Sequence, residues 1–264
     1  MEALRLPVLR TVKLAVKDSI NIISRMPILC LLALLAAVLF KLIEEIVLGP
    51  ALTGEASAQN TLETYLIDIA EYTYVVPLAV FSCRFVILGR TATWREALRI
   101  KDILIAYGTV SIVFATAIFL PLLILKSNPD QLDAAVSMIF LTAFLISLSI
   151  LIYWAIRWSL IYPAIAVDQI GASLQWSART TKGIAWRVFI TNATIPVIFS
   201  ALLIPFLIEG YVDQIGRWSI LLTAFASVSS NILFAAVASE IYLWCRANRE
   251  SCDVSAPRAI SVPA

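Results

Sequence analysis

Six long apolar runs dominate this sequence and restrict what it can fold into. They cover roughly residues 28–48, 72–90, 103–125, 134–165, 186–208 and 218–245. A transmembrane helix needs about 20 predominantly apolar residues to cross the hydrocarbon core of a bilayer. Hydrophobic residues make up 61% of the 264 and charged residues 14%, whereas soluble domains average about 45–50% and about 25%. The sequence therefore predicts an all-α integral membrane protein with six transmembrane helices.

Basic residues alternate between the segments that connect these runs. From the first segment to the last, the segments carry five, none, four, one, three, one and three Lys and Arg residues. Short cytoplasmic segments of membrane proteins are enriched in Lys and Arg. The alternation therefore predicts a multi-pass protein whose N- and C-termini both lie in the cytoplasm, in agreement with an even number of spans.

The chain divides into three predicted parts. Residues 1–27 form an amphipathic N-terminal segment, residues 28–246 the six-helix transmembrane domain, and residues 247–264 a polar cytoplasmic tail expected to be disordered. Within 4–25, helical spacing gathers apolar residues on one face, namely Leu9, Val12, Val16, Ile20 and Ile23. The opposite face carries Arg10, Lys13, Lys17, Asn21 and Ser24. This pattern predicts a helix in the membrane interface, and the alternative is a soluble helix packed on the protein.

Two internal connections resemble this N-terminal segment in position and composition. Thr93 and Ser173 are candidate helix caps, and each precedes a Trp and then basic residues, just before the next apolar run. We expect short amphipathic interfacial helices on the cytoplasmic side over 93–101 and 173–183. The candidate lipid-headgroup contacts are Arg10, Lys13, Lys17, Arg95, Arg99, Arg179 and Lys182. An interfacial helix followed by two spans would then occur three times, as a three-fold pseudo-repeat.

Three charged residues fall inside predicted spans. Arg84, Arg157 and Glu240 each lie in the cytoplasmic half of a span, where a charge costs about 2.5–3.5 kcal/mol at the helix centre. We expect them to form an intramembrane polar cluster in which Glu240 pairs with Arg157 or Arg84. Such a cluster is either a structural ion pair, with arginine reaching the headgroups, or a site for a substrate or ion.

The last span also carries a polar stripe, and no part of the sequence carries a catalytic motif. Thr223, Ser227, Ser230 and Asn231 lie towards one side of that span, a pattern typical of hydrogen bonds between helices. There is no histidine, no C-x-x-C pair, no Walker loop, no G-x-S-x-G and no H-E-x-x-H. We therefore expect no catalytic residue, no metal site, no cofactor and no nucleic-acid partner.

One stretch resembles a known family. It runs from Arg157 through Pro163 to Asp168, and continues with Gly171 to Ser177, the Thr180-Thr181-Lys182-Gly183 turn and Trp186. This stretch of about 30 residues resembles bacterial six-span proteins related to the membrane domain associated with glycerophosphodiester phosphodiesterases. The resemblance implies a bacterial inner (plasma) membrane protein. The phosphodiesterase activity of fused members belongs to a separate soluble barrel with catalytic histidines, so it is not expected here.

The sequence leaves three functional hypotheses. The first is a non-enzymatic inner-membrane protein that organises lipids or a complex, with membrane lipids and a membrane-protein partner or a second copy of the chain as binding partners. The second is a small transporter or channel that uses Arg157 and Glu240. The third, an intramembrane enzyme, has the least support, because no residues suited to catalysis converge in the sequence.

Overall fold

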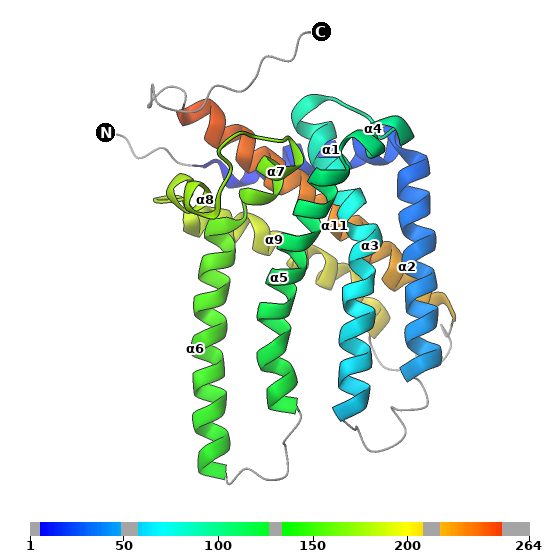
Figure 1. Ribbon diagram of the computed structural model, residues 1–264, viewed down its shortest axis with the longest axis vertical. Helices are drawn as coiled ribbons and strands as arrows, with labels where there is room; N and C mark the ends of the chain where they lie inside the picture. The colour runs from blue at the N-terminus through cyan, green and yellow to red at the C-terminus, as the bar shows by residue number, and fades with distance from the viewer. Residues whose placement is uncertain (1–5, 49–57, 127–133, 208–216, 250–264) are drawn as a thin grey trace.

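The computed structural model describes residues 6–48, 58–126, 134–207 and 217–249, and the regular structure within them is helical (Figure 1). The helices are α1 (Val8–Arg25), α2 (Pro27–Leu48), α3 (Ala58–Leu88), α4 (Trp94–Arg99), α5 (Lys101–Lys126), α6 (Ala134–Trp158), α7 (Ile161–Ala166), α8 (Leu174–Thr180), α9 (Ala185–Leu207) and α11 (Arg217–Arg249). The all-α prediction is confirmed for this part of the chain. Helix α11 continues to Arg249, so residues 247–249 of the predicted tail are helical, and residues 250–264 lie outside the described ranges.

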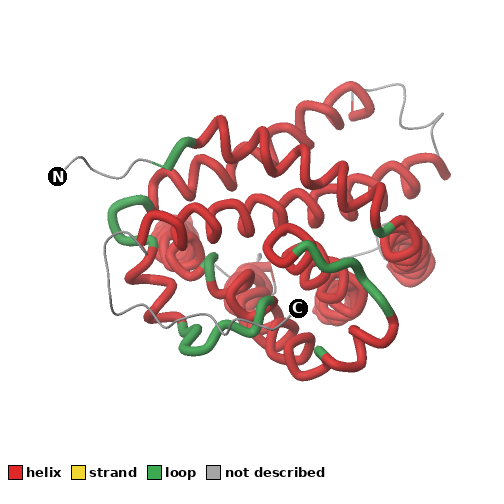
Figure 2. Tube along the Cα trace, turned by 90° about the horizontal axis from the view of Figure 1, so that it is seen from above, coloured by secondary structure: helices red, strands yellow, loops and turns green. Residues whose placement is uncertain are grey.

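Four helices stand side by side and three others cross behind them. In Figure 1, α2, α3, α5 and α6 are upright, whereas α9 and α11 run obliquely at the back and α1 lies across the top. The view from above in Figure 2 shows the upright helices end-on and the other three lengthwise. Helix α11 packs against α1, α2, α3, α7 and α9, and α3 packs against α2, α5, α7 and α11. Helices α3 and α11 are therefore the centre of the fold.

Small side chains bring α3 and α11 together. Ala79, Ser82 and Cys83 of α3 are buried, as are Ala235 and Ala236 of α11. Apolar burial does not drive association between helices inside a bilayer, so small residues that permit close backbone approach are favoured at such contacts. The Sγ of Cys83 reaches the carbonyl oxygen of Ala235 at 3.7 Å, which is direct evidence of that close approach.

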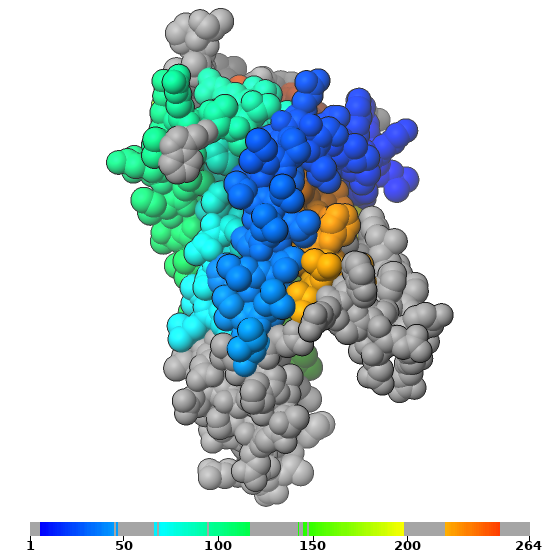
Figure 3. All heavy atoms as spheres, turned by 90° about the vertical axis from the view of Figure 1, so that its right-hand side faces the viewer, coloured from blue at the N-terminus to red at the C-terminus, as the bar shows by residue number. Residues whose placement is uncertain are grey.

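Four segments of the described chain are long and apolar enough to cross a membrane. They are Pro27–Glu44, Ile69–Leu88, Leu148–Ala166 and Ile220–Asn248. Helix α2 presents Leu31, Leu35 and Leu39 outward, each more than half exposed, and it covers one side of the molecule next to α3 and α11 (Figure 3). An apolar outer surface of this kind is suited to lipid. The membrane-protein class is thus supported directly by the fold.

Two tight corners position the short helix α4 near α1. Met26 leaves the helical conformation (φ −128°, ψ 51°) and Pro27 opens α2, as expected for a residue that precedes proline. Gly89 ends α3 with a φ of +67°, which favours glycine. The backbone N–H of Ala92 then donates to the Sδ of Met26 at 3.2 Å. This contact fixes the connection before α4 against the corner between α1 and α2.

Candidate functional site

Helix α1 has three faces rather than the two predicted. Thr11, Ala15 and Ile22 are buried against the rest of the molecule. The predicted apolar face is turned outward, with Leu9, Val16, Ile20 and Ile23 between 40% and 87% exposed. The basic face with Arg10, Lys13 and Lys17 is also exposed. The buried face gives little hydrophobic signal in the sequence, because only Ile22 of its three buried residues is a large aliphatic one.

The outward apolar face argues against a soluble helix packed on the protein. A helix of that kind buries its most apolar stripe in the protein core. Here the protein buries Thr11, Ala15 and Ile22, and the wider aliphatic face of α1 stays exposed. Adjacent apolar and basic exposed faces are typical of a helix that lies in a membrane interface.

Helices α4 and α8 form with the predicted caps. The Oγ of Thr93 accepts the backbone N–H of Glu96 at 3.2 Å, and the Oγ of Ser173 accepts that of Trp176 at 3.1 Å. The basic residues proposed to contact headgroups are exposed on both helices, namely Arg95, Arg99, Arg179 and Lys182. The ring of Trp176 packs on the ring of Tyr242, with centroids 6.3 Å apart.

Arg84 is buried and has a carboxylate partner. Its side chain donates to the carbonyl oxygen of Ala166 at 2.8 Å and to Oε1 of Glu96 at 3.1 Å. Arg90 lies 3.8 Å from the same oxygen of Glu96. One carboxylate from α4 therefore compensates the buried charge at the end of α3.

Arg157 is held by uncharged groups. One guanidinium nitrogen donates to the carbonyl oxygen of Ala178 at 2.6 Å, and the other to the hydroxyl of Tyr153 at 3.2 Å. The guanidinium carbon lies 5.6–5.7 Å from the ring centroids of Tyr153 and Trp154, within range of a cation–π interaction. The Oγ1 of Thr181 donates back to the carbonyl oxygen of Arg157 at 3.1 Å. These contacts join the end of α6 to α8.

Glu240 lies on a different side of the bundle, against α1. Its carboxyl group interacts with that of Asp18 and with the guanidinium of Arg10. In the described chain, the expected ion pair between Glu240 and Arg157 or Arg84 is not formed. The reason is packing: α11 turns this position towards α1, whereas Arg157 faces α8 and Arg84 faces α4.

The sequence analysis also missed an ion pair between α2 and α3. The Nζ of Lys41 lies 2.6 Å from the carboxylate of Glu44 and 3.3 Å from that of Glu71. Lys41 and Glu44 are one helical turn apart, which is a sequence signal for pairing. The pairing of Lys41 with Glu71 has no such signal in the sequence, because it depends on how α2 and α3 pack.

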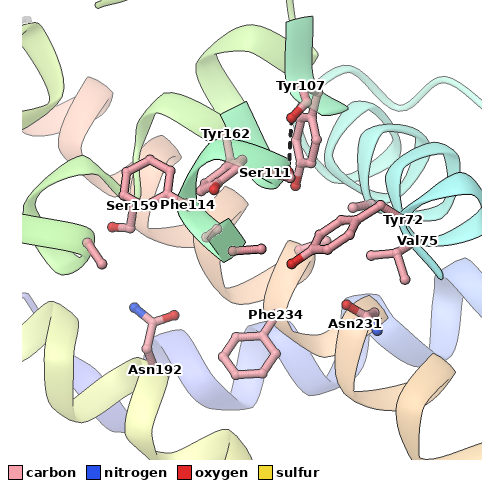
Figure 4. A pocket seen from close by; sticks show the side chains of 15 residues that line it. Tyr72, Val75, Tyr107, Ser111, Phe114, Ser159, Tyr162, Asn192, Asn231 and Phe234 are labelled. Carbon is pink, nitrogen blue, oxygen red and sulfur yellow. Dashed lines mark hydrogen bonds between the residues drawn. The ribbon is translucent and has the colours of Figure 1, made fainter. Parts of the chain in front are cut away.

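A cavity of about 460 Å³ lies between the helices (Figure 4). It is lined by residues of α3, α5, α6, α7, α9 and α11 together with Ser159, and none of these described lining residues is charged. Aromatic rings from four helices surround it, namely Tyr72, Tyr107, Phe114, Tyr162 and Phe234. Ligand pockets are commonly of this size, mostly apolar, with a few polar groups that fix orientation.

Two amide side chains are among the polar groups that line the cavity. Asn192 and Asn231 point into it from α9 and α11 (Figure 4). Each amide nitrogen donates at 2.9 Å to a carbonyl of its own helix, at Val188 and Ser227 respectively. This geometry presents the amide oxygens as acceptors for a ligand donor. Asn231 thus bonds within its helix and lines the cavity, whereas Ser227 of the same polar stripe lies 3.5 Å from the hydroxyl of Tyr74 in α3, a hydrogen bond between helices of the kind predicted.

Across residues 6–48, 58–126, 134–207 and 217–249, no group of three His, Cys, Asp or Glu side chains could hold a metal ion.

Comparison of the chain with protein-family models, curated proteins and solved structures gives no match. The resemblance to the membrane domain associated with glycerophosphodiester phosphodiesterases therefore stays a prediction.

Proposed function

We propose that this chain is a non-enzymatic inner-membrane protein that binds and organises anionic lipids at the cytoplasmic face of the membrane. The observation that carries the proposal is the exposure of two adjacent faces of α1, one apolar and one basic. Helices α4 and α8 extend the basic surface with Arg95, Arg99, Arg179 and Lys182.

The two faces of α1 supply different kinds of binding energy. Full burial of an aliphatic side chain the size of Leu or Ile in an apolar phase is worth about 1.5–3 kcal/mol. Each Lys or Arg near an anionic leaflet adds about 1 kcal/mol. The apolar face therefore fixes the depth of the helix, and the basic face selects anionic headgroups over zwitterionic ones.

The proposal includes six spans, with α5 and α9 added to the four apolar segments above. With 26 and 23 residues, these helices are roughly 35–39 Å long, which matches a bilayer core crossed at a tilt. Each of α1, α4 and α8 is followed by two long helices, in keeping with the proposed three-fold pseudo-repeat. Positive charge places these short helices and both termini in the cytoplasm.

Reporter fusions test this topology. A reporter active only outside the cytoplasm should work when it is fused near Gln59, Asp130 or Asp213. It should be silent near Arg95, Arg179 or Arg258. A reversed result at any one site would remove the six-span arrangement, because the alternation leaves no spare helix.

Lipid composition tests the function itself. The full chain is extracted with its surrounding lipid by a nanodisc-forming polymer, and the ratio of anionic to zwitterionic lipid is measured. The triple variant Arg10→Gln, Lys13→Gln, Lys17→Gln should carry less anionic lipid than the unmodified chain. The matched control is Asn21→Ala with Ser24→Ala, which alters the same face without removing charge. Equal enrichment in all three proteins would refute the proposal.

A second candidate function, transport of an uncharged amphiphile, is favoured by the central cavity. Arg157 and Glu240 do not line it, so a transporter would use Asn192 and Asn231 instead. The substitution Ala155→Phe would place a ring in the cavity, and it should block uptake of such a substrate while leaving lipid enrichment unchanged. Unaltered uptake in this variant would remove the transport candidate.

A further inference from the structure

A second cavity, of about 420 Å³, lies where α3 meets α4 and is rich in arginine. It is lined by Arg84, Arg90, Thr93, Arg95, Glu96, Arg99 and Ile100. Four guanidinium groups and one carboxylate thus surround it, an excess of three positive charges. Side chains of like charge repel one another unless an anion lies between them.

Arg84 gives this cavity a fixed, buried donor. Arg84 is 5% exposed, and its two terminal nitrogens donate hydrogen bonds to the carbonyl oxygen of Ala166 and the carboxylate of Glu96. Its Nε is buried and makes no hydrogen bond in the described chain. A buried donor without an acceptor is destabilising, but the Nε of Arg157 shares this state away from the cavity, so the argument for the site rests on the charges that line it.

The one carboxylate of the cavity is already engaged. In the described part of the chain, the ion pairs that reach the cavity are those of Glu96 with Arg84 and with Arg90. Glu96 would repel a bound anion, but these two cations offset its charge. Arg95 and Arg99, both exposed, remain to complete a site for an anion.

Guanidinium groups recognise phosphate with particular geometry. Each presents parallel N–H donors that match two oxygens of a phosphate, and several arginines can share one phosphate group. The cavity lies beside α4, which the proposed orientation puts at the cytoplasmic headgroup level, where lipid phosphates are concentrated.

We propose that Arg84, Arg90, Arg95 and Arg99 form a binding site for a phosphate monoester group. This inference rests on the proposed function and narrows it, because it assigns one bound phosphate to one site. The phosphate comes either from the headgroup of phosphatidic acid or from free phosphate in the cytoplasm.

Two probes distinguish these sources. The first is inorganic phosphate, titrated into the full chain in neutral detergent and followed by calorimetry. The second is phosphatidic acid, counted by native mass spectrometry after release of the chain from phosphatidylcholine nanodiscs that contain it. Binding of one molecule of either probe supports the site, and binding of phosphatidic acid alone identifies the lipid as the source. Binding of neither overturns the proposal.

Because Arg95 and Arg99 are exposed, a variant that replaces both should still fold. The double variant Arg95→Gln, Arg99→Gln should weaken binding of the effective probe about 10-fold or more, since it removes two charge-assisted donors. Arg84→Lys keeps the buried charge but removes the planar fork, and it should weaken binding as well. Unchanged affinity in the double variant would overturn the site.

A variant of α1 that removes the same amount of charge tests whether phosphate binds at this site or is attracted by positive charge in general. Lys13→Gln, Lys17→Gln removes the same charge from α1 and should leave phosphate affinity within about 2-fold of the unmodified chain. If it weakens binding as much as Arg95→Gln, Arg99→Gln does, the binding is general attraction, and the site is refuted while lipid organisation stands. If the α1 variant loses bulk anionic lipid but keeps its one phosphate, both proposals are supported.

Discussion

The ends of α3 and α6 each carry an arginine, and they accommodate it in different ways. Arg84 at the end of α3 is buried and has the carboxylate of Glu96 as its partner. Arg157 at the end of α6 is half-buried and is held by a carbonyl oxygen and two aromatic side chains. In sequence, both are a single arginine in an apolar run.

The difference shows that the depth of the charge decides which partner it needs. A buried charge requires an opposite charge, and removal of that partner typically costs about 3–5 kcal/mol. A charge at the rim keeps part of its solvation, so neutral acceptors and ring faces are sufficient. The two ends should therefore respond unequally to substitution.

The largest effect is expected from Glu96→Gln. This change leaves Arg84 buried without its carboxylate, and it should lower the free energy of unfolding in detergent by about 3 kcal/mol. The double variant Arg84→Met, Glu96→Gln removes the orphan charge and should recover much of that loss. Chemical denaturation followed by circular dichroism measures both. If the loss in the double variant equals the sum of the losses in Arg84→Met alone and Glu96→Gln alone, the pair does not interact.

A smaller loss is expected at the other end, from Arg157→Leu. The hydrogen bond to Ala178 and the cation–π contacts are lost, but no charge is left unpaired, so we expect about 1–2 kcal/mol. Because Glu240 has separate partners, the losses from Arg157→Leu and Glu240→Leu should add in the double variant. A coupling energy above about 0.5 kcal/mol between Arg157 and Glu240 would show that the two residues interact, as the sequence predicted.

The two caps sharpen the same comparison. Thr93→Ala and Ser173→Ala each remove one capping hydrogen bond, worth about 1 kcal/mol. The loss should be larger for Thr93→Ala, because its bond partner is the backbone of Glu96, which also holds Arg84. The melting temperatures of the two variants measure this difference. The controls are Thr93→Ser and Ser173→Thr, which keep the capping hydroxyl. A larger loss at Ser173 would contradict it.

The smallest effect is expected where two acidic groups meet. Asp18→Asn replaces one of two adjacent carboxyl groups with an amide that can donate to Glu240. Stability at neutral pH should rise by about 0.5 kcal/mol or less, since a repulsion is removed at a partly exposed site. The same denaturation measurement detects it, with Asn21→Ala as the control, and a fall in stability would show that the acidic pair is structurally required.

Features that depend on neighbouring residues in the chain could be predicted from the sequence. The caps at Thr93 and Ser173 follow from the residues beside them, and the amphipathic pattern of α1 follows from its period. Which face of α1 would touch the protein did not follow, because the buried residues Thr11 and Ala15 are inconspicuous on any hydropathy scale.

The partners of the intramembrane charges could not be predicted for a related reason. Pairing Arg157 with Glu240 assumed that two charges of opposite sign in adjacent half-spans would meet. Rotation of each helix about its own axis decides this instead, and it turns Glu240 towards α1 and Arg157 towards α8. The central cavity needs residues from six helices, so no local pattern could have revealed it.

The central place of α11 has a consequence for how the protein is made. Helices α1, α2 and α3 all pack on α11, which the ribosome produces well after them. About 130 residues separate the end of α3 from the start of α11. At a synthesis rate of about 5–20 residues per second, this takes roughly 6–26 s. During that interval the small-residue surface of α3 has no α11 to pack against, so this contact forms only after α11 has been made.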